Sequence, residues 1–381
     1  MIARSLTARP LSAEEMTRTA TAIADLQQRD GSIPWEKGRH ADPWNHLEAA
    51  MGLDVAGFHD VAQRAIEWLA GVQRPDGSWP MSYVGGGVAD HSVDTNFTAY
   101  IAAAVWHHYL VTGDRPFLSA LWPTVASAIE FVGRQQGPGG EIWWAVDDAG
   151  RAWKSALLTA SSSIHLSFGA ALAIADELGF ERPGWRNARR LLRHAIAHRR
   201  NVFEPRDRYA MDWYYPVLSG ALDFVPARAR LVERWRRFVV PGRGVRCVCD
   251  RPWVTVAETC ELAIALCMVG WRQEAFELFD RTRRMREEDG SYWTGLTYPD
   301  DVCWPEERTT WTAGAVLLAA AAIEGRSSSQ GLFRLAGPAQ NAQAPLRPRL
   351  DVVAALQRRP VHLARSLAAL RGIEEHVMDG E

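Results

Sequence analysis

Apolar residues recur along most of the chain at the three- and four-residue spacing of amphipathic helices. This periodicity predicts a chain of helices separated by short polar or glycine-containing breaks. Asp114 with Pro116 stands at one predicted start, and Pro183 and Pro226 stand near two others, as N-cap and first-turn preferences require. The predicted helices cover residues 12–28, 43–54, 58–73, 94–112, 115–135, 154–179, 184–201, 208–223, 226–239, 253–269, 271–285 and 306–324.

A short motif recurs where four of these helices end: a glycine turn followed by tryptophan. Glycine there supplies a left-handed helix cap, and the tryptophan is expected to pack back on the helix ends. A repeat near 50 residues long fits one helical hairpin plus one long loop. The motif lies in residues 23–35 (IADLQQRDGSIPW), 66–80 (IEWLAGVQRPDGSWP), 129–144 (IEFVGRQQGPGGEIWW) and 286–293 (REEDGSYW).

The connections between the predicted helices alternate between tight turns and long loops. Six hairpins with this alternation predict an all-α fold, a single (α/α)6 toroid over residues 1–325, with the even-numbered helices forming an inner ring. Residues 326–349 are rich in Ser, Gln, Ala and Pro, which is typical of a linker, and helical periodicity returns from Leu350. We therefore expect residues 326–381 to form a linker and a C-terminal helical tail.

Composition excludes several classes of function. The net charge is −2, which leaves no basic surplus for binding nucleic acid. The N-terminal residues lack the apolar segment of a secretory signal, and no run of about 18 apolar residues predicts a membrane span. We expect a cytoplasmic protein whose five cysteines are reduced. The sequence does not indicate an oligomeric state.

The long loops differ from the tight turns in their chemistry. All six long loops lead into inner helices, and each contributes acidic and aromatic residues. We expect them to gather at one mouth and to line a funnel that binds a small molecule or an oligosaccharide. Trp79 and Trp143 belong to the repeated turn and are expected to serve packing, while Asp42, Asp114 and Asp207 are expected to act as helix N-caps.

Three carboxylates are the candidate catalytic residues. Asp94, Asp212 and Glu306 each lie at or just inside a predicted inner-helix start, next to aromatic residues. A carboxyl group held between apolar rings has a raised pKa and can act as a general acid, whereas one nearer water stays ionised and can act as a base. Asp94 and Asp212 are the candidate acid and charge stabiliser, and Glu306 is the candidate base.

Hydrogen-bonding and aromatic residues of the same loops are the candidate substrate-binding groups. No metal site and no cofactor are predicted: Cys247-x-Cys249 and Asp301-x-Cys303 could each give two ligands, but no histidine follows at ligand spacing on a helix. The substrate-binding candidates are Trp44, Asn45, Glu48, Asp90, His91, Asn96, Trp144, Lys154, Tyr209, Trp213, Tyr214, Trp253, Asp301, Trp304 and Glu307.

Three segments resemble the six-hairpin glycosidases, notably the glucoamylase-like family: residues 112–132, 155–179 and 304–324. The resemblance implies an inverting hydrolase with two carboxylates about 6.5–9.5 Å apart. It places Glu306 near the base of that family. The acid of that family follows a tryptophan in the loop before the sixth helix, where this chain has Ala145 after Trp144. Asp147, Asp148, Asp94 or Asp212 could take its place.

A second resemblance is to triterpene cyclases and to prenyltransferase β-subunits. Residues 66–79 are similar to the QW repeat of the cyclases, residues 90–95 (DHSVDT) to their acid motif, and Asp301-x-Cys303 to half of a prenyltransferase zinc site. This resemblance implies a terpenoid cyclase or prenyltransferase-like enzyme with Asp94 as acid, and with Mg or Zn if a diphosphate is ionised. A non-catalytic toroid that binds glycan or lipid is the third alternative. The many hydrogen-bonding groups favour a carbohydrate-active enzyme that cleaves a glycosidic bond.

Overall fold

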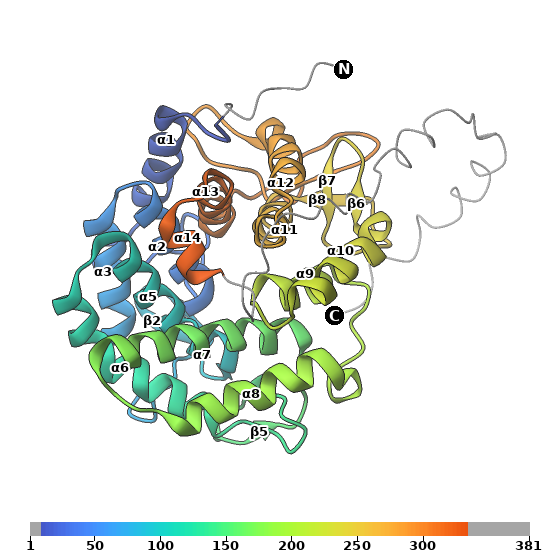
Figure 1. Cartoon of the computed structure of the whole chain (residues 1–381). Helices are drawn as coiled ribbons and strands as arrows, with labels where there is room; N and C mark the ends of the chain where they lie inside the picture. The colour runs from blue at the N-terminus through green and yellow to red at the C-terminus, as the bar shows by residue number, and fades with distance from the viewer. Residues whose placement is uncertain (1–8, 334–381) are drawn as a thin grey trace, which may run out of the picture. The chain divides into compact units, whose positions relative to one another are not determined.

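A closed ring of inner helices forms the centre of the protein. The computed structural model describes residues 9–333, and the predicted C-terminal helical tail, which begins at Leu350, lies outside the described residues. Each inner helix packs against the next, and the last packs against the first, so that the ring closes (Figure 1). In ring order the inner helices are α2 (Pro43–Val55), α4 with α5 (Thr95–Ala99 and Ile101–Thr112), α7 (Leu158–Leu178), α9 (Met211–Leu218), α11 (Val256–Met268) and α13 (Thr310–Glu324).

A second layer of helices covers the ring from outside. Apart from the first, each outer helix lies in the chain between two inner helices, and all of them pack mainly against the inner helix that comes before them in ring order. The prediction of an all-α fold of six helical hairpins is therefore confirmed. The outer helices are α1 (Ala13–Ala24), α3 (His59–Gly71), α6 (Arg115–Gly133), α8 (Pro183–His198), α10 (Phe224–Phe238) and α12 (Arg272–Phe279), the last followed by the 3-10 helix η2 (Asp280–Met285).

The helix boundaries differ from the predicted ones in two places that bear on the mouth. The segment predicted as one helix from residue 94 is interrupted at Tyr100, which separates α4 from α5. The last inner helix starts at Thr310, with Thr309 as its N-cap, and not at Glu306. Glu306 consequently lies on the loop that precedes the helix.

Where it occurs, the recurrent glycine turn links the outer helix that ends there to the following outer helix. The side-chain amide of Gln73 donates to the carbonyl of Gly77 in its own turn and to Thr124 of α6, both at 3.0 Å. Gln27 and Gln136 make the same pair of bonds in their turns, to α3 and α8. Trp79 is buried and donates to Leu69, so its predicted packing role holds.

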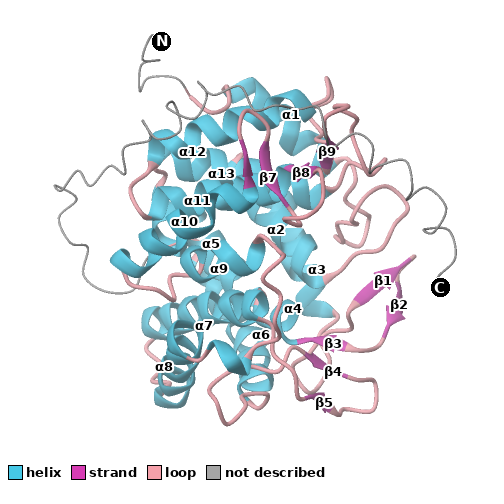
Figure 2. Cartoon of the chain, turned by 90° about the vertical axis from the view of Figure 1, so that its right-hand side faces the viewer, coloured by secondary structure: helices cyan, strands magenta, loops and turns pink. Residues whose placement is uncertain are grey.

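Short strands lie on the long connections, which the sequence analysis treated as loops. They form a hairpin and two small antiparallel sheets, and Figure 2 shows β1, β2, β3, β4, β5, β8 and β9 at the same side of the ring. This side is the mouth. The strands are β1 (Ser82–Val84), β2 (Gly87–Asp90), β3 (Val93–Asp94), β4 (Ala145–Val146), β5 (Ala152–Trp153), β6 (Val239–Val240), β7 (Gly244–Arg246), β8 (Trp253–Thr255) and β9 (Gly295–Thr297).

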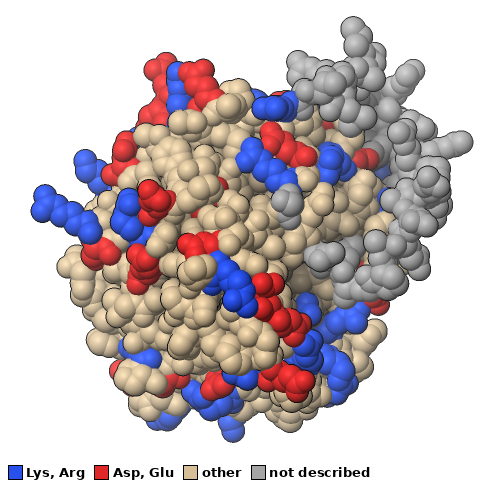
Figure 3. All heavy atoms as spheres, turned by 60° about the vertical axis from the view of Figure 1, so that its left-hand side comes forward, with Lys and Arg blue, Asp and Glu red and all other residues tan. Residues whose placement is uncertain are grey.

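The opposite end of the ring carries the tight turns and a short final helix, α14 (Ser327–Leu332), which packs on α5 and α13. Helix α7 is, among the described residues, the one helix long and apolar enough to cross a membrane. Within its most apolar window 83% is buried, as in the core helix of a soluble protein. On the face drawn in Figure 3, acidic and basic side chains alternate, and no large region of one sign is visible.

Candidate active site

The N-termini of the six inner helices meet at the mouth, where carboxylates occupy several first turns. Asp42 is the N-cap of α2 and Asp94 the N-cap of α4, while Asp212 and Glu258 lie in the first turns of α9 and α11. The ring order puts the helices of Asp94 and Glu258 opposite each other, and those of Asp42 and Asp212 opposite each other. The mouth thus presents carboxylates from facing walls.

Asp94 is held in a well-defined position. One carboxylate oxygen accepts hydrogen bonds from the backbone N–H groups of Asn96 (2.7 Å) and Phe97 (3.1 Å). Burial raises the pKa of Asp94 to about 7 despite these bonds, and the negative charge of Asp42 adds to the rise. A carboxyl group with this pKa can hold and release a proton near neutral pH, as a general acid requires.

Asp42 lies beside Asp94 and is itself firmly held. Its carboxylate accepts from the backbone and side-chain amides of Asn45, at 3.0 and 2.5 Å, and lies 3.6 Å from Nε2 of His40. Asp42 is therefore an N-cap, as predicted, but its carboxylate is also close enough to act on the charge of Asp94.

A second group of carboxylates lies deeper, between α2 and α11. Tyr100 donates to Glu48 (3.1 Å), and Tyr214 and Tyr215 both donate to Glu261. Burial raises the pKa of Glu48 to about 7. Burial also raises the pKa of Glu261 well above its usual value, and the charge of Glu48 adds to the rise. This group, which we call the Glu48–Glu261 network, fixes the tyrosines on which the floor of the mouth is built.

The floor itself is aromatic and centres on Trp44. Its ring lies 5.9 Å from that of Trp311, and about as far from Phe97, Tyr100 and Tyr215. These rings come from α2, α4, α9 and α13, so the inner helices contribute jointly to one apolar surface. Trp35 stacks on the far side of Trp311 and on His40.

Several buried polar atoms of this floor have no partner within the described residues. They include Nε1 of Trp44, Nε1 of Trp311 and Oδ1 of Asn96. A buried N–H or C=O group without a partner costs free energy, so such atoms in a mouth point to hydrogen bonds with a ligand. Two donors and one acceptor around an aromatic surface fit a sugar, which has hydroxyl groups around apolar C–H faces.

The other two predicted catalytic carboxylates differ in their surroundings: Asp212 lies in the first turn of an inner helix, as expected, whereas Glu306 does not. Asp212 is buried, and its carboxylate accepts from the backbone N–H and the hydroxyl of Thr159, so that it connects α9 to α7. Burial raises the pKa of Asp212. Glu306 is exposed, whereas its neighbour Glu307 accepts from Nε1 of Trp35 (3.1 Å) and the hydroxyl of Thr294 (3.0 Å).

Other predicted binding residues fall into three groups. The prediction that Trp213 binds substrate is wrong. Its ring is fully buried, stacks on Phe238 and donates from Nε1 to the carbonyl of Arg230, so it faces the outer helix α10. Tyr214 is likewise fully buried, in the Glu48–Glu261 network. Exposed on the loops are Asp90, His91, Lys154, Asp301 and Trp304, while Trp44, Asn45, Glu48, Asn96, Trp144, Tyr209, Trp253 and Glu307 are partly or fully buried.

Asp301 is engaged with basic residues, because Arg243 and Arg284 both pair with it. Within residues 9–333, no three His, Cys, Asp or Glu residues are grouped so that they could hold a metal ion.

Glu258 was not among the predicted residues. It is buried, and its charge helps to raise the pKa of Glu261 and of Cys247. It was missed because it lies within an almost entirely apolar helix, whose pattern does not mark it as a site residue.

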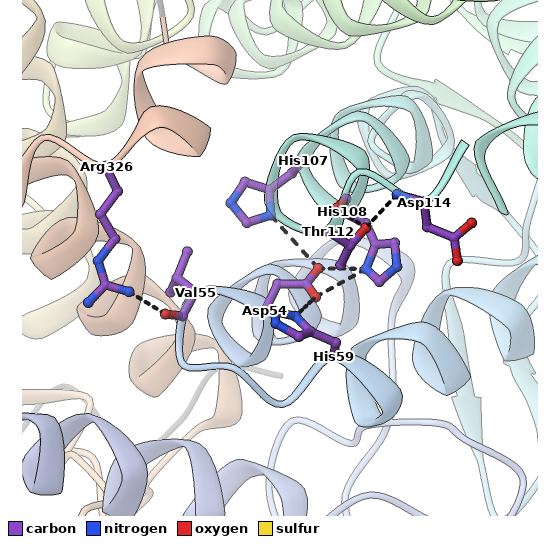
Figure 4. A network of polar contacts seen from close by, with 8 residues as sticks. All are labelled: Asp54, Val55, His59, His107, His108, Thr112, Asp114 and Arg326. Atoms are coloured by element: carbon purple, nitrogen blue, oxygen red, sulfur yellow. Dashed lines mark hydrogen bonds and ion pairs between the residues drawn. The ribbon is translucent and has the colours of Figure 1, made fainter. Parts of the chain in front are cut away.

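Two polar features lie outside the mouth. A cavity of about 290 Å³ borders α8 and includes Arg190, Arg193 and His194, but none of the mouth residues line it. At the tight-turn end, Asp54 accepts from His108 (3.0 Å) and His59 (3.2 Å), with His107 at 4.0 Å (Figure 4). The pair His107-His108 is therefore part of the core.

Comparison with known proteins identifies relatives that act on sugars. The chain is 52% identical over 324 residues to the MMP endo-(1,4)-3-O-methyl-alpha-D-mannosidase of Mycolicibacterium hassiacum, which covers 85% of this chain and 90% of the relative. It is also 31% identical over 84 residues to an uncharacterized glycosyl hydrolase of Methanocaldococcus jannaschii, 22% of this chain and 14% of that protein. No model of a known protein family matches the chain.

Solved structures of similar fold include sugar enzymes. A glycosidase variant in complex with glucose superposes with a TM-score of 0.62 at 15% identity, over 85% of this chain and all of that one. A D-mannose isomerase superposes with a TM-score of 0.61 at 9% identity, over 82% and 96% of the two chains. At such identities these likenesses concern the fold alone.

Proposed function

This chain belongs to the family of the MMP endo-(1,4)-3-O-methyl-alpha-D-mannosidase of Mycolicibacterium hassiacum and is a glycoside hydrolase; from that premise we propose that it cleaves (1,4) linkages inside chains of 3-O-methyl-α-D-mannose. The observation that carries the proposal is the 52% identity over 324 residues, which amount to 85% of this chain and 90% of the relative. The cyclase-like and non-catalytic alternatives have no comparable support.

Asp94 is the general acid in the mechanism that we propose. Its pKa of about 7 leaves it largely protonated at slightly acidic pH, and the two backbone N–H groups that it accepts from are suited to the carboxylate left after proton transfer. It would protonate the glycosidic oxygen as the bond to the anomeric carbon breaks.

Glu258 is the general base that we propose, because it is buried in the first turn of the inner helix opposite Asp94. It would take a proton from the water that attacks the anomeric carbon from the other face of the sugar. Such an arrangement inverts the configuration and requires carboxyl groups about 6.5–9.5 Å apart. Glu306, the base that the sequence favoured, is the competing assignment.

The remaining carboxylates have supporting roles in this proposal. Asp42 keeps the pKa of Asp94 high through its charge. Asp212 holds α9 against α7 through Thr159. Trp44 supplies an apolar face for the sugar, while Nε1 of Trp44 and Oδ1 of Asn96, which have no partner among the described residues, would bond its hydroxyl groups. We propose that carboxylate chemistry suffices and that no metal or cofactor takes part.

The test is hydrolysis of a defined (1,4)-linked 3-O-methyl-α-D-mannose oligosaccharide, with products identified by mass spectrometry and their anomeric form by proton NMR. We expect shorter oligosaccharides, inversion, and no effect of EDTA. Asp94→Asn and Glu258→Gln should each lower kcat by about 10²- to 10⁴-fold. Asp114→Asn, which changes an N-cap aspartate at the other end of the ring, serves as the matched control.

Two outcomes would correct the mechanism while leaving the hydrolase intact. If Glu306→Gln abolishes turnover and Glu258→Gln does not, the base is Glu306. If Asp94→Asn retains full turnover, Asp94 is not the acid and Asp42 or Asp212 takes its place. Absence of any shorter product with the wild-type protein would contradict the proposed substrate itself.

A further inference from the structure

Exposed apolar side chains are concentrated at the mouth. Among the described residues, eight large hydrophobic side chains are exposed, and five of these belong to the mouth loops. Two of the five are tryptophans, Trp153 at 50% and Trp304 at 52% exposure. Exposed aromatic side chains on the loops of a candidate ligand-binding mouth are placed to contact a ligand. The five residues are Val84, Val88, Trp153, Val302 and Trp304.

Each exposed tryptophan is fixed by a second, more buried one. Trp153 stands edge-on against Trp144, with ring centres 5.3 Å apart and planes at 88°. Trp304 stands in the same way against Trp253, at 5.1 Å and 79°. Nε1 of Trp253 also donates to the backbone oxygen of Trp304 (2.8 Å). Both exposed rings are therefore oriented before any ligand arrives, which reduces the entropy lost on binding.

The backbone under both rings belongs to the small sheets of the mouth. Trp153 lies in β5, opposite Ala145 of β4, and the N–H of Trp304 donates to Gly295 of β9 (3.0 Å). Figure 2 shows β5 and β9 well apart on the same side of the ring. Trp153 precedes α7 and Trp304 precedes α13, and these inner helices are three places apart in the ring of six, on opposite walls.

We propose that Trp153 and Trp304 are outer platforms for the glycan chain, each binding a methylated sugar unit on one side of the cleaved bond. The proposal rests on the proposed function. A sugar ring presents C–H groups on its faces, and a 3-O-methyl group enlarges that apolar surface, which suits an exposed indole ring.

The ring positions connect these platforms with cleavage inside a chain. Asp94 and Glu258 belong to the second and fifth inner helices, and the two platforms precede the third and sixth. A glycan lying across the mouth from Trp153 to Trp304 would pass between the two carboxylates. An enzyme that cuts within a chain needs sugar contacts on both sides of the bond, and this arrangement provides one on each.

The test compares long and short substrates. We would measure kcat/KM on (1,4)-linked 3-O-methyl-α-D-mannose oligosaccharides of ten and of four units, and on the unmethylated ten-unit chain. In Trp153→Ala and Trp304→Ala, the ratio of kcat/KM for ten units to that for four units should fall at least five-fold. Trp153→Phe should restore most of it, and the loss should be smaller on the unmethylated chain.

Phe180→Ala is the matched control, because Phe180 is 40% exposed and stacks on Trp122, but follows α7 at the tight-turn end. In this variant, the ratio of kcat/KM for ten units to that for four units should stay within two-fold of the wild-type ratio. The assignment of Trp153 and Trp304 as platforms would be contradicted if the alanine variants lost kcat/KM equally on both lengths or lost none. It would also be contradicted if size-exclusion chromatography showed a change in oligomeric state and no length effect appeared.

Failure of the proposed function gives a different result. If the wild-type protein cleaves none of these chains, isothermal titration with the ten-unit oligosaccharide still decides the question. Binding that weakens at least five-fold in Trp153→Ala supports the platform, whereas equal binding or none contradicts it.

Discussion

Asp94 both caps helix α4 and holds a proton near neutral pH. Because a general acid must be protonated, we expect kcat/KM to fall about ten-fold per pH unit above pH 7. The charge of Asp42 contributes to the raised pKa of Asp94. Asp42→Asn should therefore lower the pKa of Asp94, so that kcat/KM begins to fall at a lower pH. Carbon-13 NMR of the Asp94 carboxyl group measures the change even if turnover is lost. An unchanged pKa would show that burial alone sets it.

The Asp54 cluster in Figure 4 predicts pH-dependent stability. Burial alone would raise the pKa of Asp54, but hydrogen bonds from His108 and His59 outweigh it and lower the pKa. The same bond raises the pKa of His59. Stabilisation through Asp54 is present above about pH 4 and lost as pH falls through its folded pKa. Stabilisation through His59 is present below about pH 6.5 and lost as pH rises through its folded pKa.

Asp54→Asn should therefore destabilise the protein by about 3 kcal/mol, with the largest difference from wild type between about pH 4 and 6.5. Urea unfolding at several pH values measures it. Glu67→Gln, which changes an exposed acidic residue of the helix that carries His59, is the control. A constant difference across the whole pH range would indicate that the histidines do not couple to Asp54.

At the scale of elements, the recurrent turn requires glycine for two reasons, its positive φ and its close contact with the next outer helix. Gly77 has φ of +94°, and a Cβ there would lie 2.3 Å from the carbonyl oxygen of Ser127 in α6. Gly57 has nearly the same φ, +89°, with nothing near its Cβ position. Gly57→Ala should cost about 1 kcal/mol for the backbone conformation alone. Gly77→Ala should cost at least about 1 kcal/mol more, because α6 must move away.

Thermal or urea unfolding of the two variants separates the two causes. If both lose the same stability, the turn does not depend on its contact with the next outer helix. The same comparison applies to Gly31 and Gly140, whose Cβ positions also meet backbone of the following outer helix.

The helices could be predicted from the sequence, but the direction of many side chains could not. Outer helices such as α8 have one apolar face, and their periodicity fixed both their position and their buried side. Inner helices such as α11 and α13 are buried on every side, so no polar face indicates where a residue points. Trp213 therefore turned out to face α10, and Glu258 was missed.

The short strands were missed for another reason. At two to four residues each, they are too short for an alternating pattern. Two of the pairings, β3 with β4 and β8 with β9, form because neighbouring long connections meet at the mouth. The long connections themselves, their acidic and aromatic content and their shared side were all predictable from helix order.

At the scale of the whole molecule, the fold depends on joining its first and last hairpins. The hydroxyl of Thr19 in α1 donates to Gly290 in the last recurrent turn (2.9 Å), and Arg283 donates to Glu15 (2.6 Å). Inside the ring, α13 packs closely on α2, where Gly52 and Gly314 face each other. The ring therefore closes through contacts between residues some 260 positions apart in sequence, all of which must form together.

Gly314→Ala tests this seam. A Cβ at Gly314 would lie 2.8 Å from the carbonyl oxygen of Glu48 and 3.0 Å from Cα of Ala49, so α13 and α2 would have to separate. Alanine favours a helix over glycine by about 1 kcal/mol, yet overpacking at the seam should leave a net loss of about 1–2 kcal/mol. Activity should fall as well, since Trp44 and Trp311 face each other across the same seam. Gly71→Ala, in helix α3 with open space around it, should be neutral or stabilising. Equal stability of the two variants would mean that the ring tolerates a wider seam and that its closure does not set the geometry of the floor.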